Sequence, residues 1–282
     1  MDAGQSVRPS PIAGRWYPGN PQRLAASVDA YISAADLPDI QGEIVAVMVP
    51  HAGHIYSGPV AGYAFSALHN KEVACAAVIS PMHHPYSQAL LTTSHRSYQT
   101  PLGEVPVDHD LIHKLDVTLK NRLGFGLTPV SRDEEHSLEI ELPFLQRSLK
   151  GAFQLLPVMV RDQSLKTTRA LGEALGEILK DVSAIMVAST DLSHFYSQTI
   201  ANELDGEFLR RVADFDPEGV LKAEDEGVGF ACGRAALAAV MWAARGLGAD
   251  KIQILNYATS GDVTGNFSEV VGYASAVMIR SK

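Results

Sequence analysis

The sequence predicts a single-domain α/β protein in which helices cover both faces of a mostly parallel central sheet. Continuous apolar runs at residues 44–49, 74–79, 155–160 and 184–188 are typical of strands that are buried on both faces. Segments with apolar residues at helical spacing separate these runs. This alternation favours a three-layer sandwich. No linker rich in Pro, Gly or Ser divides the chain, so we expect one domain over residues 1–282.

The first helix is predicted to begin at Asn20 and Pro21. Asn is a favoured N-cap residue, and Pro is favoured at the first helical position. Leu24, Val28 and Ile32 then follow at helical spacing and predict one buried face.

Three further helices are predicted at residues 171–179, 200–212 and 236–244, because their apolar residues recur three or four positions apart. Residues 252–255 and 273–279 are short, mainly apolar segments near the end of the chain. We expect these two segments to be the closing strands of the sheet.

The remaining segments carry weaker patterns. Residues 89–100 alternate weakly between apolar and polar side chains, so we expect an extra strand at one edge of the sheet. Residues 1–12 are expected to form an N-terminal tail. Residues 133–141 are expected to open a helix, because acidic residues and Ser are favoured in a first turn.

Composition excludes several classes of protein. Acidic residues outnumber basic ones by 32 to 23, which argues against binding to nucleic acid or to an anionic membrane surface. The apolar runs are too short to span a bilayer. Two cysteines are too few for a disulfide framework and suit a reducing compartment. Since residues 1–14 lack a signal-peptide pattern, a cytoplasmic protein is expected.

Reactive side chains follow three of the four buried runs. His51 follows the first run, His83 follows the second, and Asp191 and His194 follow the fourth. Ligand sites in open α/β sheets form beyond the carboxyl ends of the strands. One His at such a place is more often a hydrogen-bonded loop residue. Three such ends in one sheet, however, indicate that these side chains converge on a site.

The two cysteines have different contexts. Cys75 lies inside a predicted strand, which is typical of a small buried core residue. Cys232 lies where a helix is predicted to start, with Arg234 nearby. A helix N-terminus and a cation both favour the thiolate, which binds metals and attacks electrophiles. The alternative for Cys232 is again a buried core residue.

Two carboxylate–histidine pairs have alternative interpretations. Asp191 and His194 are an acid/base unit or an outer pair that orients a ligand, or Asp191 caps the next helix. Glu135 and His136 belong to a solvated helix start, or they supply an acid and a base. Spacing alone does not choose between these alternatives.

Ten short motifs follow one another along the chain: A-G-R-W-Y-P from Ala13, P-H-A-G from Pro50, Y-S-G from Tyr56, P-M-H-H from Pro81, T-P-L-G from Thr100, E-H-S-L-E from Glu135, L-P-F from Leu142, S-T-D-L-S-H from Ser189, C-G-R from Cys232 and Y-A-T-S-G-D from Tyr257. In this order they resemble the motifs of the Memo family, also named AmmeMemoRadiSam system protein B. Arg15 and His54 depart from that pattern, in which Ser and Tyr are common.

The resemblance implies a fold like the catalytic subunit of class III extradiol ring-cleaving dioxygenases. It also implies that His51, His83 and Cys232 are metal ligands and that Asp191 and His194 line the same pocket. The metals it implies are iron or copper. In bacteria and archaea it further implies partnership with a radical-SAM enzyme and an AMMECR-type protein.

The leading hypothesis is therefore a metal-dependent, dioxygenase-like oxidoreductase that acts on a small molecule. Iron is the expected metal, with copper and zinc as alternatives. His194 would be the acid/base, Asp191 would orient it, and Glu135 and His136 would also be catalytic. A thiolate ligand is itself oxidisable, which speaks against ring cleavage as such. The alternatives are a non-catalytic scaffold or peptide-binding protein with a vestigial metal site, and a zinc-dependent hydrolase.

Overall fold

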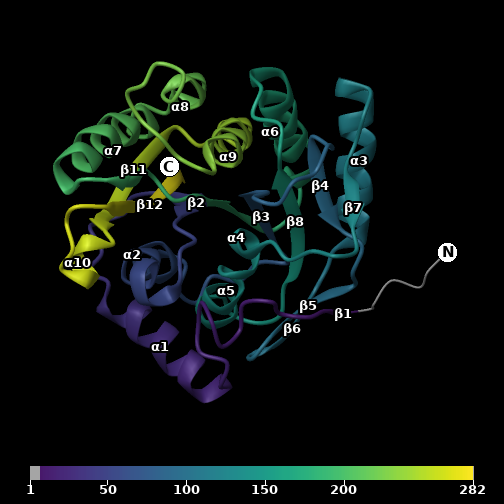
Figure 1. Cartoon of the computed structure of the whole chain (residues 1–282). Coiled ribbons are helices and arrows are strands. Elements are labelled where there is room, and N and C mark those ends of the chain that lie inside the picture. The colour runs from purple at the N-terminus through teal and green to yellow at the C-terminus, as the bar shows by residue number, and fades with distance from the viewer. Residues whose placement is uncertain (1–6, 282) are drawn as a thin grey trace.

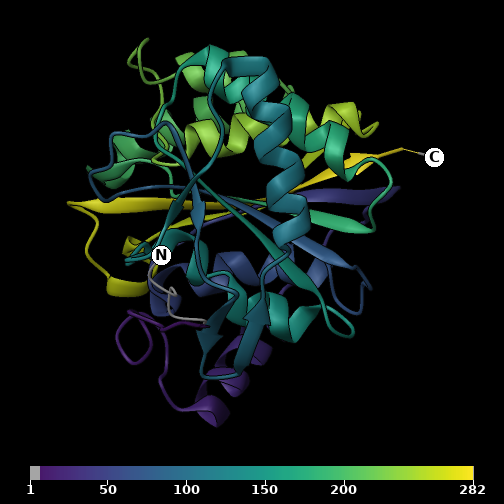
Figure 2. The same cartoon turned by 90° about the vertical axis from the view of Figure 1, so that its right-hand side faces the viewer.

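A mixed nine-stranded sheet runs through the middle of the molecule (Figures 1 and 2). The computed structural model describes residues 7–281. In sheet order, its strands are β10 (His194–Tyr196), β12 (Val270–Arg280), β2 (Glu43–Val49), β9 (Ala184–Ser189), β3 (Cys75–Pro81), β8 (Gln154–Val160), β4 (Leu90–Thr93) and β7 (Thr128–Val130), while β11 (Lys251–Thr259) pairs with β12.

The centre of the sheet is parallel, as predicted. Strands β2, β9, β3 and β8 are the four continuous apolar runs, and each pairs in parallel with its neighbour. The two predicted closing strands are β11 and β12, which run antiparallel to each other, and β12 runs antiparallel to β2. On the other side, β4 is antiparallel to β8. The fold is thus the predicted α/β sandwich, with antiparallel strands toward its edges.

A second, three-stranded sheet corrects two predictions. It consists of β1 (Val7–Arg8), β5 (Ser97–Thr100) and β6 (Gly103–Pro106). The single edge strand expected over residues 89–100 is wrong, because the chain bends after β4 and β5 turns back into β6 at Gly103, where φ is +120°. The tail expected over residues 1–12 is wrong from residue 7 onward, since β1 pairs with β5. Residues 1–6 lie outside the described residues.

Helices cover both faces of the main sheet (Figure 2). One face carries α3 (His109–Leu123), α6 (Leu165–Leu179), α7 (Gln198–Ala213), α8 (Pro217–Lys222) and α9 (Arg234–Gly246). The other carries α1 (Pro21–Ala34), α2 (His54–Ala67), α4 (His136–Glu139) and α5 (Leu142–Ser148). A short helix, α10 (Gly261–Thr264), lies between β11 and β12. Within residues 7–281, no helix combines the length and the apolar character needed to cross a membrane.

The first predicted helix, α1, forms for the expected reasons. The side chain of Asn20 caps α1 by accepting a hydrogen bond from the amide of Arg23, at 3.0 Å. Leu24 and Val28 of α1 are fully buried. Burying side chains of this size stabilises the fold by about 1.5–3 kcal/mol each. Helix α2 was not predicted, because its small residues are buried on several sides and show no one-sided pattern.

Helix α2 packs very closely against α1, and its glycines make this possible. A Cβ atom added at Gly62 would lie 2.4 Å from the carbonyl oxygen of Tyr31. A Cβ atom added at Gly58 would lie 2.6 Å from the Tyr31 ring. Both contacts are shorter than van der Waals distance. The contact at Gly62 is with the backbone, which cannot move aside as a side chain can, so α2 holds its position only with glycine there.

We predict that Gly62→Ala lowers the free energy of unfolding by about 1–3 kcal/mol, because the new methyl group overpacks the α1–α2 contact. Gly206 in α7 is the matched control, since a Cβ atom there meets nothing within 4 Å. Gly206→Ala should raise the free energy of unfolding by about 0.5–1 kcal/mol through its higher helix propensity. Urea denaturation of both variants checks this, and equal effects would contradict the packing argument.

Candidate metal centre

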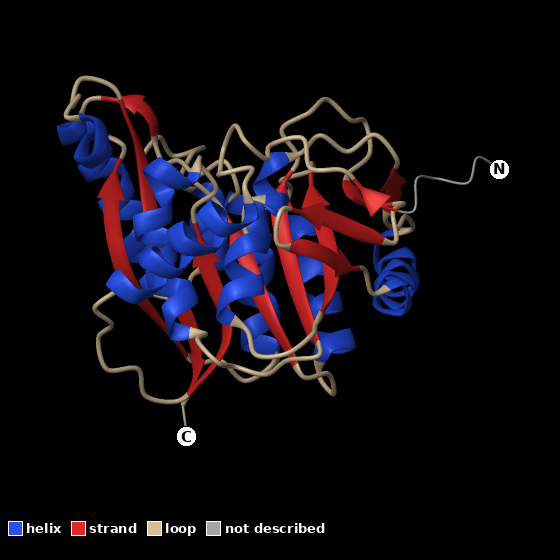
Figure 3. Ribbon diagram, turned by 90° about the horizontal axis from the view of Figure 1, so that it is seen from below, coloured by secondary structure: helices blue, strands red, loops and turns tan. Residues whose placement is uncertain are grey.

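Three adjacent central strands of the main sheet have their carboxyl ends on the same side of the molecule, and this row of strand ends is called the carboxyl edge of the sheet. His51 follows β2, Asp191 follows β9 and His83 follows β3, and the sheet order β2-β9-β3 makes these strands neighbours. Figure 3 shows the strands of the main sheet side by side, with loops at their ends. The amide of His51 donates a hydrogen bond to Asp191 Oδ1 across this edge, at 2.7 Å. The convergence predicted from the three strand ends is therefore present.

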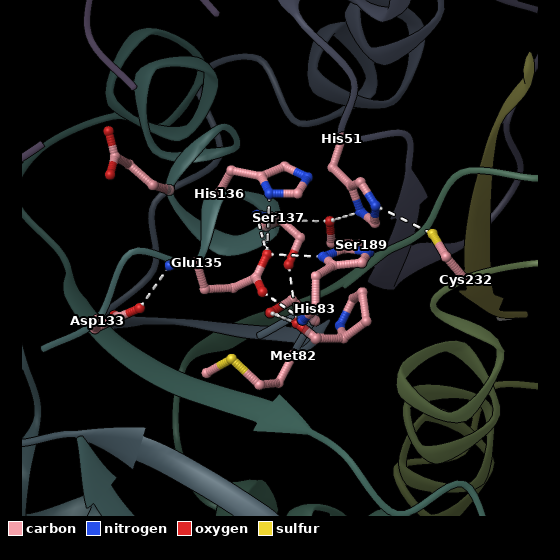
Figure 4. Close-up of polar contacts among 12 residues, drawn as sticks. His51, Met82, His83, Asp133, Glu135, His136, Ser137, Ser189 and Cys232 are labelled. Carbon is pink, nitrogen blue, oxygen red and sulfur yellow. Dashed lines mark hydrogen bonds and ion pairs between the residues drawn. The ribbon is translucent and has the colours of Figure 1, made fainter. Parts of the chain in front are cut away.

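Three histidines form the densest part of the site (Figure 4). His51, His83 and His136 each offer one ring nitrogen, and these nitrogens all lie within 4.8 Å of one another. The rings of His83 and His136 are stacked, with centroids 4.7 Å apart. The His51 ring is 5.3 Å from the ring of His83 and 5.5 Å from that of His136. This group can hold a metal ion, because imidazole nitrogen is a common ligand of zinc, copper and iron.

Hydrogen bonds to Nδ1 orient two of these rings. His83 Nδ1 donates to the carboxylate of Glu135 at 2.9 Å. His51 Nδ1 donates to Ser189 Oγ at 2.8 Å. We assign these tautomers from the acceptors, since a carboxylate offers no proton. In both rings Nε2 is then left to bind a metal, which is the usual arrangement of metal-ligating histidines.

Glu135 is the acidic residue at the centre of the cluster. Its carboxylate also accepts hydrogen bonds from the amides of His83, at 2.5 Å, and Ser137, at 2.9 Å. One of its oxygens lies 3.2 Å from His136 Nδ1. Burial by itself raises the pKa of Glu135, but the hydrogen bond and charge of His83 outweigh it and hold that pKa well below the ordinary carboxyl range. The carboxylate is therefore ionised and favours a cation at the histidines.

Ser189 connects His51 to a second buried carboxyl group. Its hydroxyl can donate to the carbonyl oxygen of Ser137, at 2.6 Å, or to Glu141 Oε1, at 3.0 Å. Either choice leaves the Ser189 oxygen free to accept from His51 Nδ1. Complete burial raises the pKa of Glu141 well above the ordinary carboxyl range. Burial therefore favours the neutral form of Glu141, which contacts His51 only through Ser189.

Cys232 lies on the other side of His51. Its Sγ is 3.1 Å from His51 Nε2. Nitrogen and sulfur ligands of one tetrahedral zinc ion lie about 3.5 Å apart, so a small side-chain rotation would let both bind the same ion. Gly233 allows this approach, because a Cβ atom there would lie 2.3 Å from the carbonyl oxygen of Ser189. His51, His83 and Cys232 remain a predicted ligand set, and the tight three-nitrogen group contains His136 instead.

The metal-free thiol of Cys232 is protonated, contrary to the expectation from its helix start. Burial and the charge of Asp191 raise the pKa of Cys232. The charge of Arg234 is balanced by ion pairs with Glu224 and, at 3.8 Å, with Asp225. The thiol would therefore lose its proton on binding a metal, as cysteine ligands do.

Asp191 and His194 do not form the pair that their spacing suggested. His194 Nδ1 donates to the carbonyl oxygen of Leu192, at 2.7 Å, so that oxygen orients the ring instead of Asp191. Asp191 faces His51, with its Oδ2 4.0 Å from His51 Nε2. Burial raises the pKa of Asp191 to about 7. His194 lies outside the three-nitrogen group, next to Phe230, with ring centroids 5.5 Å apart.

Burial favours the neutral form of three imidazoles near the site, those of His51, His136 and His194. It lowers the pKa of His51 well below the ordinary value, and it lowers that of His136 to about 4. It also lowers the pKa of His194. Neutral imidazole is the form that binds metals. His54 is buried elsewhere and donates from Nε2 to the carbonyl oxygen of Ile140, at 3.0 Å, so its contacts are structural.

Two contributors to the site were missed in the sequence. Ser189 opens the motif S-T-D-L-S-H, and its place directly at the end of β9 was the available signal. The indole of Trp16 covers the His136 ring, with centroids 4.2 Å apart. The motif A-G-R-W-Y-P contains Trp16 but carries no sign of that contact, which joins segments 120 positions apart along the chain.

A cavity of about 290 Å³ adjoins the site and is lined in part by Met82, His83, Arg161, Phe230 and Cys232. Its size suits a small organic molecule. A larger hollow of about 530 Å³ lies at α7–α9 and contains no His or Cys among its lining residues. Its walls are mainly charged side chains, so it is a solvated surface feature away from the candidate metal centre.

The fold and site together define an α/β sandwich with a histidine-rich candidate metal centre at the carboxyl ends of its parallel strands. Residues 8–277 match the family model described as "Memo-like protein", and the chain belongs to that family. A "MEMO1 family protein" of Nitrosopumilus maritimus is 33% identical over 277 residues, which cover 97% of this chain and 100% of the relative. A second, from Thermoplasma volcanium, is 32% identical and covers 97% of this chain and 99% of the relative.

The fold also resembles a solved structure outside these relatives. The crystal structure of an uncharacterized protein from Escherichia coli K12 matches with a TM-score of 0.53. The match covers 83% of this chain and 100% of that chain, at 12% sequence identity. At this identity the likeness supports the α/β fold alone.

We predict that Glu141→Gln makes the metal-free protein's stability less dependent on pH. The raised pKa of Glu141 means that the folded protein keeps a proton that the unfolded chain releases. This contribution is full below the unfolded carboxyl pKa and declines as pH rises, by up to about 1.4 kcal/mol per pH unit. Gln stays neutral throughout this range.

Urea denaturation in EDTA, at about pH 5 and about pH 8, measures this difference. The exposed Glu203→Gln in α7 is the control and should follow the wild type. An unchanged pH dependence in Glu141→Gln would show that Glu141 is ionised in the folded protein.

Proposed function

We propose that this protein is a metal-dependent oxidoreductase that uses iron or copper and acts on a small organic molecule. The observation that carries the proposal is the cluster of His51, His83 and His136 nitrogens beside the Cys232 sulfur. Neutral imidazoles and a thiolate suit iron and copper, and also zinc. An oxidoreductase function requires iron or copper at this site, because zinc has no redox chemistry of its own.

His51 and His83 would hold the metal through Nε2, since hydrogen bonds occupy their Nδ1 atoms. We propose Cys232 as the third ligand, because its Sγ already contacts His51 Nε2. Three protein ligands leave a coordination position for another molecule, which is typical of a catalytic site. When bound, the metal would supply one-electron chemistry.

The residues around this set would serve binding and proton transfer. The cavity lined by His83, Phe230 and Cys232 would receive the substrate next to the metal. His194 donates its Nδ1 proton to the Leu192 carbonyl group, so its free Nε2 would accept a proton from a bound molecule. The lowered pKa of His194 keeps that nitrogen unprotonated at neutral pH. Asp191, with a pKa of about 7, would give or take a second proton.

We expect protein purified without oxygen to contain about one iron or copper ion per chain. His51→Ala should lose that metal, because it removes a proposed ligand. His69→Ala is the matched control. His69 is exposed in the turn after α2, so this substitution should leave the metal content unchanged. Elemental analysis of the three proteins measures this. Stoichiometric zinc with no iron or copper would contradict the redox function.

Cobalt(II) reconstitution distinguishes the third ligand. We expect the wild type to show a sulfur-to-cobalt charge-transfer band that Cys232→Ser abolishes. His136→Gln should retain the band, because His136 is not a member of the proposed ligand set. If Cys232→Ser binds cobalt as tightly as the wild type and His136→Gln does not, the three histidines are the ligands instead.

A further inference from the structure

Arg8 is a fully buried cation on the first strand of the molecule. Only 1% of its surface is exposed, and it lies on β1, outside the main sheet. Removing a guanidinium group from water costs several kcal/mol, as an order of magnitude, unless ion pairs and hydrogen bonds offset it. The contacts of Arg8 therefore have to be strong, and its hydrogen bonds all go to the segment that carries Glu135 and His136.

Three partners share the Arg8 guanidinium group. Arg8 Nε donates to Asp133 Oδ2 at 2.7 Å, and Nη1 pairs with Glu139. Arg8 Nη2 donates to the carbonyl oxygen of Glu135 at 2.7 Å. The ring of Tyr98 lies 4.7 Å from the guanidinium carbon, and its hydroxyl donates to Asp133 Oδ2 at 3.0 Å. Each of the three guanidinium nitrogens of Arg8 thus makes a hydrogen bond within one buried network.

This network holds the backbone of Glu135 at both of its polar groups. The Glu135 amide donates to Asp133 Oδ1 at 2.9 Å, while the Glu135 carbonyl oxygen accepts from Arg8. With its backbone held, the Glu135 side chain reaches the amide and Nδ1 of His83. In Figure 4, Asp133, Glu135 and His83 follow one another toward His51.

We propose that Arg8 is a positioning residue for the metal centre: through Asp133 and the Glu135 backbone, it fixes the carboxylate that orients His83. This inference rests on the proposed metal-binding role of His83. The N-terminal strand is then part of the site's construction, although Arg8 does not touch the three-histidine group.

The sign of the effect separates positioning from simple electrostatics. A buried cation near a metal ion repels that ion, so removing Arg8 would strengthen metal binding if charge alone mattered. Positioning predicts the opposite, because a free Glu135 no longer holds the His83 ring. Loss of an outer partner of a metal ligand weakens metal binding by about 10- to 100-fold.

The test is a cobalt(II) titration of folded protein, with affinity measured well below the melting temperature. We expect Arg8→Met to weaken cobalt binding by about 10- to 100-fold and to alter the cobalt absorption spectrum. Arg8→Lys should restore part of the affinity, because an ammonium group can still pair with Asp133. Arg147→Met is the matched control, since it breaks an exposed Arg–Asp ion pair with Asp29 and should leave the affinity unchanged.

A double-mutant cycle with Glu135→Gln tests whether Arg8 affects the metal centre through Glu135. If Arg8 acts through Glu135, Arg8→Met should change cobalt affinity by less than about twofold in the Glu135→Gln background. Fully additive effects of the two substitutions on cobalt affinity would show that Arg8 does not act through Glu135. Should Arg8→Met fail to fold, Tyr98→Phe removes a single hydrogen bond to Asp133 and should weaken cobalt binding by about two- to tenfold.

The two proposals fail in different ways. A wild type that binds no cobalt(II) would overturn the metal-dependent function and the role of Arg8 with it. A wild type that binds cobalt(II), with unchanged affinity in Arg8→Met and Tyr98→Phe, would overturn only the positioning role. Tighter binding in Arg8→Met would also overturn it and would identify Arg8 as a repulsive charge.

Discussion

The carboxylate of Glu135 is the group on which the rest of the candidate metal centre depends. It accepts from the backbone and the ring of His83, caps α4 at the Ser137 amide, and lies against His136 Nδ1. A buried carboxylate stays ionised only where hydrogen bonds and opposite charges offset its lost hydration. Here the contacts that meet that requirement also orient the His83 ring, against which the His136 ring is stacked.

Support for Glu135 comes from strands outside the main sheet. Arg8 on β1 and Tyr98 on β5 both bond to Asp133, which holds the Glu135 amide. The small sheet β1-β5-β6 therefore does more than close one end of the sandwich. It supplies Arg8, a buried cation that pairs with the buried carboxylates of Asp133 and Glu139. The chain as a whole has an excess of acidic residues.

Much of the fold and part of the site were predictable from local patterns. The buried runs became β2, β3, β8 and β9, and their carboxyl ends brought His51, His83 and Asp191 to one edge. Helix α2 was not predictable in this way, because burial on several sides removes the one-sided pattern. The spacing of Asp191 and His194 suggested a pair, yet backbone direction gave each a different partner.

The sequence by itself determined the class of fold, the strand ends that carry the candidate site residues and the family to which the chain belongs. Tertiary structure alone decided that His136 joins His51 and His83, that the Cys232 thiol is protonated without metal, and that Arg8 is buried. The physical reason is the separation along the chain between the residues that interact. Strand and helix patterns record contacts between near neighbours, whereas burial and charge pairing depend on segments that meet only after folding, such as Arg8 and Asp133.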